Sequence, residues 1–251
     1  MTGRPEPRHP YLDWGGCLAF AHRGGTGAHP ENTLAAFTHA ASLGFTYLET
    51  DVHLTADGVL VAFHDADLER TCDRPGRIAD LPWSEVEVAR VGGREPIPRF
   101  DELLEALPDA RFNIDCKSDE AVDALVRALR RHDVLHRVCV GAFSDRRLRR
   151  LRRELGAELC TSLGPTETAR LTFGMPTPAE VHAAQVPVRS GPVEVVTERR
   201  VARAHRRGLQ VHVWTIDDPS EMERLIDLGV DGIMTDRPEV LRDVLIRRGL
   251  W

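Results

Sequence analysis

Residues 47–65 read YLETDVHLTADGVLVAFHD, and this stretch carries most of the information about the fold. Residues 47–52 combine aromatic, aliphatic and β-branched side chains, which predicts a strand. On a strand, Glu49 and Asp51 point to the same face, roughly 6.5 to 7 Å apart. Two carboxylates on one face of an otherwise apolar strand are costly to bury unless they are paired or bind a cation. We therefore expect this strand to contribute to a charged site.

The dipeptide Asp57-Gly58 lies between two apolar runs, which predicts a hairpin turn into a second strand at 59–63. If these two residues form the whole loop, counting back along both strands places Asp51 opposite His64. Residues that face each other across a hairpin lie on one face, with Cβ atoms about 5 Å apart. We therefore expect His64 beside the two carboxylates.

Short β-branched runs alternate with amphipathic stretches along the rest of the chain. We expect further strands at 18–21, 112–116, 138–142, 159–163, 185–188, 210–215 and 232–235, and helices at 32–43, 99–107, 120–131, 145–155, 201–207, 221–228 and 238–247. Repeated β–α order in about 250 residues favours an α/β fold, either a closed (β/α)8 (TIM) barrel or an open, doubly wound sheet. We favour the barrel because polar residues follow several different strands and no convincing Gly-rich phosphate loop is present.

The length of 251 residues suits one large domain. Residues 1–16 contain three prolines and no apolar stretch, so we expect a flexible leader followed by a single domain at 17–251. Residues 67–98 are rich in Arg, Gly and Pro, which predicts an insertion, or a lid, near the top face of the barrel.

Composition excludes several classes of protein. Lys plus Arg (33) against Asp plus Glu (39) gives a formal charge of −6, which argues against a nucleic-acid partner. No apolar run approaches the roughly 18 residues of a membrane span, so no stable membrane insertion is expected. The five cysteines are odd in number and none are spaced as CxxC, which predicts reduced thiols and a cytoplasmic location.

Polar residues also follow the strands at 18–21 and 112–116. His22 and Arg23 come directly after the first of these strands. In the second, Asn113, Asp115 and Lys117 alternate with apolar residues, and Lys117 is the one lysine of the chain. A lysine retained among so many arginines suits a position where a compact charge is needed.

These residues together have a definite chemistry. Carboxylates at Glu49, Asp51 and Asp115 suit a hard divalent cation, Mg²⁺ or Ca²⁺. Arg23 and Lys117 can hold a phosphate, and His22 and His64 can act as acid and base near neutral pH. A cation beside a phosphate and two histidines is typical of phosphodiester cleavage.

Trp214 has two possible roles, and several other polar residues are assigned structural or solvent-exposed roles. Trp214, at a strand end, either walls a substrate pocket or packs the top of the barrel. We interpret Asp236 as a helix N-cap, His53 as part of a solvated hairpin, and the arginines of 146–153 as a solvated helix face.

At these positions the sequence resembles the glycerophosphodiester phosphodiesterases. The resemblance runs through ordered motifs between about residues 18 and 240, and the set as a whole is specific although each motif alone is weak. The motifs are His22-Arg23-Gly24, Pro30-Glu31-Asn32-Thr33, Glu49-x-Asp51, Thr55-Ala56-Asp57-Gly58, His64-Asp65, Asp115-x-Lys117, Val213-Trp214-Thr215-Ile216 and Gly229-Val230-Asp231-Gly232-Ile233-Met234-Thr235-Asp236-x-Pro238.

The resemblance implies a TIM barrel that hydrolyses small glycerophosphodiesters to glycerol 3-phosphate and an alcohol with a divalent cation. It implies that His22 and His64 are the acid/base pair, that Arg23 and Lys117 contact phosphate, and that the three carboxylates bind the cation. The family favours glutamate at the position of Asp115, which is one methylene shorter. Two alternatives stay open, a phospholipase D-type activity on lysophospholipids and a catalytically silent barrel that binds a phosphorylated metabolite. The sequence does not indicate the oligomeric state.

Overall fold

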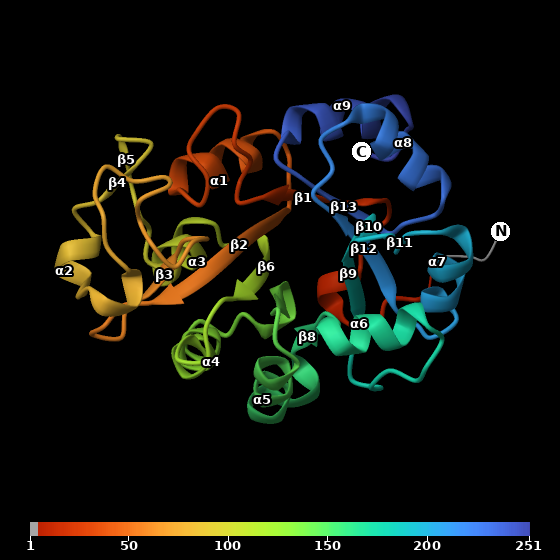
Figure 1. Cartoon of the computed structure of the whole chain (residues 1–251). Coiled ribbons are helices and arrows are strands. Elements are labelled where there is room, and N and C mark those ends of the chain that lie inside the picture. Colours follow the sequence, from red (N-terminus) through yellow and green to blue (C-terminus); the bar gives the residue numbers. More distant parts are fainter. Residues whose placement is uncertain (1–4) are drawn as a thin grey trace.

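The computed structural model describes residues 5–251, and within them eight parallel strands form a barrel (Figure 1). Their order around the barrel is β8-β7-β6-β2-β1-β13-β12-β9, and a bridge between Ser162 and Ala183 joins the two end strands. The strands are β1 (Leu18–His22), β2 (Tyr47–Leu54), β6 (Arg111–Cys116), β7 (Val138–Gly141), β8 (Cys160–Thr161), β9 (Ala183–Pro187), β12 (Gln210–Trp214) and β13 (Gly232–Thr235). The predicted (β/α)8 fold is confirmed.

Helices surround the barrel and cover the outer faces of the strands (Figure 1). They are α1 (Leu34–Ser42), α3 (Phe100–Ala106), α4 (Ala121–Arg131), α5 (Asp145–Leu155), α6 (Pro165–Thr172), α7 (Glu198–His205), α8 (Pro219–Asp227) and α9 (Pro238–Arg247). Residues such as Phe37, Leu125 and Leu148 turn inward from them and are fully buried against the sheet. Helix α6 was not expected from the sequence, because its eight residues, PTETARLT, give too short and too polar a pattern.

The inside of the barrel follows from the two-residue period of its strands. Alternate residues point inward, so Phe20, Tyr47, Cys139 and Met234 pack in one apolar cluster below the polar ends of the strands. The cluster continues into the chain before the first strand, where Tyr11 of the short helix η1 (Pro10–Leu12) is fully buried.

The segment at η1 therefore closes the lower end of the barrel. The Tyr47 hydroxyl donates to the Tyr11 carbonyl at 2.7 Å, and Arg111 donates to the same carbonyl at 3.0 Å. The prolines of residues 1–16 predicted a flexible leader, but Tyr11 and Leu12 are buried here; residues 1–4 lie outside the described residues. The difference arises because Tyr11 and Leu12 pack into the apolar cluster at the lower end of the barrel, and a local sequence pattern does not reveal that contact.

Strand β3 (Leu60–Ala62) pairs with β2 in an antiparallel hairpin, but its register differs by one residue from the prediction. Leu54 pairs with Leu60, so position 51 faces Phe63 rather than His64. The loop has three residues, because the Thr55 amide donates to the Val59 carbonyl at 2.9 Å. Gly58 ends this loop with φ of +85°, the left-handed residue that a three-residue hairpin requires.

Residues 67–98 lie outside β2 and β3, to one side of the barrel (Figure 1). They contain η2 (Ile78–Asp80), α2 (Trp83–Val86), β4 (Arg90–Val91) and β5 (Glu95–Pro96). Their apolar residues form a cluster of their own with β3, in which Val61, Leu68 and Ile78 are fully buried. The domain limits at 17 and 251 stay a prediction.

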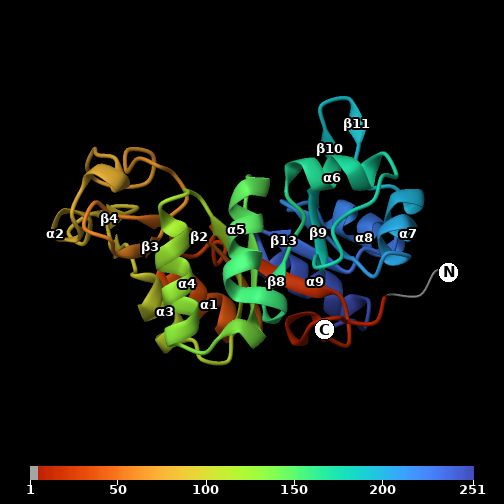
Figure 2. The same cartoon turned by 90° about the horizontal axis from the view of Figure 1, so that it is seen from below.

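Different segments lie at the two ends of the barrel. The hairpin of β10 (Arg189–Ser190) and β11 (Val193–Glu194) projects from one end of the barrel, and the C-terminus lies at the other end (Figure 2). Short helices η3 (Leu135–Arg137) and η4 (Gly156–Glu158) precede β7 and β8.

All five cysteines are free, and among the described residues no helix has the length and hydropathy of a bilayer span.

The arginines of 146–153 are not uniformly a solvated face. Arg152 is buried on α5 and forms a two-bonded ion pair with Glu167 of α6, at 2.7 and 3.0 Å. Thr161 and the Ser162 carbonyl accept two more of its hydrogen bonds. This arginine therefore ties α5, β8 and α6 together, which the charge pattern of one helix does not predict.

Candidate active site

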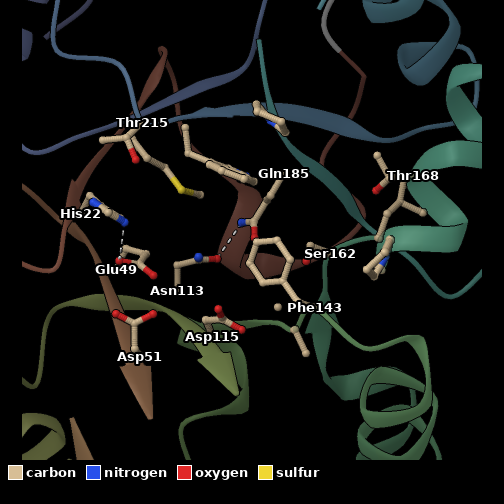
Figure 3. Close-up of a pocket in the computed structure, with 18 of the residues that line it drawn as sticks. His22, Glu49, Asp51, Asn113, Asp115, Phe143, Ser162, Thr168, Gln185 and Thr215 are labelled. Carbon is tan, nitrogen blue, oxygen red and sulfur yellow. Dashed lines mark hydrogen bonds and ion pairs between the residues drawn. The ribbon is translucent and has the colours of Figure 1, made fainter. Parts of the chain in front are cut away.

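A cavity of about 450 Å³ opens at the carboxyl ends of the barrel strands. Figure 3 shows side chains from many strands pointing into it. All eight residues singled out from the sequence line this cavity, namely His22, Arg23, Glu49, Asp51, His64, Asp115, Lys117 and Trp214. The barrel brings them together because parallel strands present their carboxyl ends at one face.

Asp51 is the most buried of the predicted carboxylates, with 2 % of its surface exposed. The Lys117 ammonium lies 2.8 Å from Asp51 Oδ1 and 2.8 Å from Asp115 Oδ2. Burial alone would raise the pKa of Asp51, but Lys117 and then Arg23 outweigh burial and hold that pKa below its ordinary value. Asp51 is therefore a fixed negative charge between two basic side chains.

Glu49 has a different environment although it stands only two residues away. It is buried, accepts a hydrogen bond from the Arg23 amide at 3.0 Å, and lies 3.8 Å from His22 Nε2 (Figure 3). Burial, followed by repulsion from Asp51, raises the pKa of Glu49 to about 7. The pKa of Glu49 therefore lies above its ordinary value, although His22 and Arg23 offset part of the rise.

Asn32 supports Asp51 from the loop after β1. Its Nδ2 donates to Asp51 Oδ2 at 2.9 Å, and its Oδ1 accepts from the Thr50 hydroxyl at 2.8 Å. Thr33 caps helix α1 by accepting from the Ala36 amide. Asn32 and Arg23 have φ of 54° and 53°, a costly conformation for residues other than glycine, and the Asn32 amide donates to the Arg23 carbonyl at 2.9 Å.

In both histidines, ring nitrogen Nδ1 lies within hydrogen-bond distance of a carboxylate oxygen. His22 Nδ1 lies 2.6 Å from Asp236 Oδ1, and His64 Nδ1 lies 2.5 Å from Asp65 Oδ1. With Nδ1 occupied in each ring, Nε2 is the nitrogen left for a substrate. Burial lowers the pKa of His22, but Glu49 and Asp236 outweigh burial and raise it overall.

The interpretation of Asp236 as a helix cap is wrong. Arg237 occupies the cap position of α9, and the Asp236 side chain turns back to His22 instead. The Asp236 amide donates to Asp217 Oδ1 at 2.8 Å, which orients the residue. Its position directly after β13 was a usable signal, because that is where barrel sites are built.

His53 also differs from its expected place in a solvated hairpin. Its Nε2 lies 3.0 Å from the His64 carbonyl, and the side chain is half-buried. This contact bridges β2 to the residue that follows β3. His64 therefore reaches the cavity although the predicted register was one residue out.

Arg23 and His64 are linked through a chain of ion pairs. Arg23 Nη1 lies 2.9 Å from Glu31 Oε1, and Arg70 Nη2 contacts the same oxygen at 2.6 Å. Arg70 also pairs with Asp65, the partner of His64. Sequence reasoning missed this link because the spacing of Glu31, Asp65 and Arg70 has no periodic signature.

The predicted cation site has three candidate oxygen donors, the carboxylates of Glu49, Asp51 and Asp115. Asp115 Oδ1 is buried and has no hydrogen-bond partner among residues 5–251, and Glu49 Oε2 has His22 Nε2 no nearer than 3.8 Å. Together with Asp51 they form an all-oxygen donor set, which fits Mg²⁺ or Ca²⁺ in chemistry. In the described part of the chain, however, no three His, Cys, Asp or Glu side chains are gathered closely enough to hold an ion, since Lys117 stands between Asp51 and Asp115.

Comparison with known proteins gives the relationship. A family model described as the "Glycerophosphoryl diester phosphodiesterase family" matches residues 22–240, which is most of the chain. The chain belongs to this family. Membership confirms the family that the motifs indicated and the assignment as a glycerophosphodiester phosphodiesterase.

Relatives within the phosphodiesterase family align over nearly the whole chain. A "Probable glycerophosphodiester phosphodiesterase 2" of Mycobacterium tuberculosis is 42% identical, with 100% of this chain and 99% of that protein covered. A "Glycerophosphodiester phosphodiesterase" of Caldanaerobacter subterraneus is 32% identical over 92% of this chain and 98% of the relative. The crystal structure of a "Putative glycerophosphoryl diester phosphodiesterase" from Silicibacter pomeroyi superposes with a TM-score of 0.81 at 26% identity, covering 96% and 97% of the two chains.

Proposed function

We propose that this phosphodiesterase hydrolyses small glycerophosphodiesters to glycerol 3-phosphate and an alcohol, with His22 and His64 transferring the protons. The observation that carries the proposal is the matched pair of histidines on one cavity. Each has a carboxylate on Nδ1, at 2.6 Å for His22 and 2.5 Å for His64. A carboxylate on Nδ1 holds the ring orientation and stabilises the charged imidazolium that forms during proton transfer.

In this mechanism one histidine accepts the proton of the attacking hydroxyl, and the other donates a proton to the oxygen of the departing alcohol. The attacking group is either water or the neighbouring hydroxyl of the glycerol unit, which would form a cyclic phosphate that water then opens. Detecting the cyclic product, and tracing solvent oxygen, distinguishes the two routes.

We assign the phosphate to Arg23 and Lys117. Both already neutralise Asp51, at 3.4 Å from Arg23 Nε and 2.8 Å from Lys117 Nζ. A phosphate between them would share this positive charge, and positive charge fixed before the reaction stabilises the transition state without reorganisation.

A divalent cation belongs to the same proposal. Glu49, Asp51 and Asp115 would hold it, and Asp115 Oδ1 is a buried oxygen without a partner in the described chain. The chemistry supplied by bound Mg²⁺ or Ca²⁺ is neutralisation of a phosphoryl oxygen. Binding would require Lys117 to release one or both carboxylates.

The test is an assay of glycerol 3-phosphate release from several diesters, with chelator and then with Mg²⁺ or Ca²⁺ restored. We expect His22→Ala and His64→Ala each to lower turnover by about 100-fold or more, the usual scale of acid–base catalysis. His136→Ala, at an exposed position in η3, is the control. Turnover like wild type in a site variant would remove that histidine from the mechanism, and inactivity of the wild type would favour a silent barrel that binds a phosphorylated metabolite.

A phospholipase D-type activity on lysophospholipids is the second candidate, and one observation favours it. None of the described lining residues comes from the polar segment 67–98, whereas Phe143 at the cavity has 69% of its surface exposed. A mouse lysophospholipase D is 28% identical over 90% of this chain. Comparing turnover of glycerophosphocholine with that of a lysophospholipid separates the two activities.

We also propose a cytoplasmic location and no nucleic-acid partner. The five free cysteines and the formal charge of −6 support these two proposals respectively.

A further inference from the structure

The cavity is divided sharply by charge. Every charged or imidazole side chain that lines it belongs to residues 22–117, on β1, β2 or β6 or within two residues of the end of β1, β3 or β6. We name this the charged half. Every lining residue from 141 to 234 is uncharged, and we name that side the uncharged half; it is formed at the ends of β7, β8, β9, β12 and β13. A phosphodiester has one charged phosphate and two organic groups, so a divided cavity suits it.

The uncharged half contains a niche floored by Gly141. A Cβ atom at this glycine would lie 3.2 Å from Ser162 Oγ and 3.4 Å from Gln185 Oε1. The missing side chain therefore leaves open the space between two oxygen atoms. Figure 3 shows Ser162 and Gln185 on the same side of the cavity, around Phe143.

Both oxygens of this niche are available to a ligand. The Gln185 amide is held by its nitrogen, which donates to Asn113 Oδ1 at 2.6 Å (Figure 3). The same nitrogen also lies 3.3 Å from His212 Nδ1, whereas within residues 5–251 Gln185 Oε1 and Ser162 Oγ have no hydrogen-bond partner. The niche thus offers one oxygen that only accepts and one hydroxyl that accepts or donates.

Aromatic rings form another wall of this half. The centroids of Phe143 and Trp214 are 5.9 Å apart, and their planes are inclined at 74°. Trp214 lines the cavity and also packs against the apolar cluster inside the barrel, so its contact with a substrate stays a prediction. Such rings pack against the C–H faces of a polyol, and the niche oxygens can pair with its hydroxyls.

A cationic aminoalcohol fits this half poorly. The described lining residues between 141 and 234 include no carboxylate. The three carboxylates of the charged half already have basic neighbours, which are His22 for Glu49 and Lys117 for Asp51 and Asp115. A buried ammonium without a counter-charge is costly, and aromatic rings offset only part of that cost.

We propose that the uncharged half binds the alcohol group of the substrate and that this alcohol is an uncharged polyol, such as glycerol or inositol, rather than choline or ethanolamine. The proposal rests on the phosphodiesterase function proposed above. Gln185 is the residue that sets the charge preference, because its oxygen is the acceptor beside the open niche.

The experiment compares kcat/KM of the wild type for glycerophosphoglycerol and glycerophosphoinositol with that for glycerophosphocholine and glycerophosphoethanolamine. We expect at least a tenfold preference for the polyol diesters. Gln185→Glu adds a carboxylate of the same shape and should shift the ratio by about tenfold toward the cationic diesters. Ala157→Glu adds the same charge at an exposed position in η4, at the other end of the barrel strands, and should leave the ratio unchanged.

Two further variants test the niche itself. Gly141→Ala fills it and Ser162→Ala removes its hydroxyl, so each should lower kcat/KM for polyol diesters more than for glycerophosphocholine. Thermal unfolding of each variant shows whether it has folded. If Gly141→Ala does not fold, the kcat/KM values of Ser162→Ala alone test the niche.

The outcomes are distinguishable. Equal or faster turnover of the choline and ethanolamine diesters by the wild type, or an unchanged ratio in Gln185→Glu, would overturn this inference alone. Failure to hydrolyse any of the four diesters would overturn the proposed function and this inference with it.

Discussion

The contact between His22 and Asp236 gives a graded prediction for catalysis. Asp236→Asn keeps the shape of the side chain and an oxygen for His22 Nδ1 but removes the negative charge. Asp236→Ala removes the acceptor altogether. We expect kcat to fall in the order wild type, Asp236→Asn, Asp236→Ala, because the 2.6 Å bond stabilises the charged imidazole.

The magnitude follows from the bond and its surroundings. A hydrogen bond to a charged group contributes roughly 1.5–3 kcal/mol and a neutral one roughly 0.5–1.5 kcal/mol. The Asn variant therefore forfeits about 1 to 2 kcal/mol, or about 5- to 30-fold in kcat, and the Ala variant about 10- to 150-fold. The Asp236 carboxylate is 30% exposed, so water replaces part of the loss and the lower end of each range is expected.

The assay is release of glycerol 3-phosphate at saturating substrate, with thermal unfolding as a check on the fold. Asp243→Asn makes the same change on an exposed carboxylate of α9 and should leave kcat unaltered. An Asp236→Ala enzyme within twofold of wild type would refute the positioning role. An Asp236→Asn enzyme as slow as His22→Ala would show instead that the carboxylate does more than orient and stabilise the ring.

Two predictions concern stability. Glu167→Gln should lower the free energy of unfolding by about 3 kcal/mol, because Arg152 would stay buried without its counter-charge. Glu221→Gln, which loosens the exposed pair with Arg224, should cost no more than about 0.5 kcal/mol in the same denaturant titration. The second prediction is a loss of stability in acid, since burial, followed by the neighbouring His9, lowers the pKa of His182 from 6.5 to about 4. The unfolded chain then binds the extra proton, so this contribution is complete above pH 6.5 and falls as the pH drops toward 4, by about 2 kcal/mol at pH 5. His182→Gln should flatten that part of the stability profile, and an unchanged slope would contradict the assignment.

Much of the fold could be predicted because it rests on local patterns. The order of strands and helices follows from hydrophobic periodicity, and polar residues at several strand ends indicated a barrel. Errors arose where a small local difference decided the result. One extra residue in the loop that ends at Gly58 shifted the β2–β3 register, and α6 is short and polar enough to escape the helical pattern.

The residues of the site were likewise predicted only in part. His22, Glu49 and Lys117 were found because each follows or lies on a strand whose carboxyl end reaches the cavity. The roles of Asp236 and Gln185 were missed because each partner is distant in the chain: 214 residues separate His22 from Asp236, and 72 separate Asn113 from Gln185.

The sequence by itself therefore determined the barrel, the family and the set of acidic, basic and imidazole groups at its upper end, because these depend on residue type and on a period of two along each strand. The tertiary structure decided which groups are paired. Pairing of β1 with β13 places Asp236 on His22, pairing of β2 with β6 places Lys117 between two carboxylates, and the complete barrel brings the charged and uncharged halves to one cavity. Charge and hydrogen bonding act over a few ångströms in space, and periodicity along the chain does not record those distances.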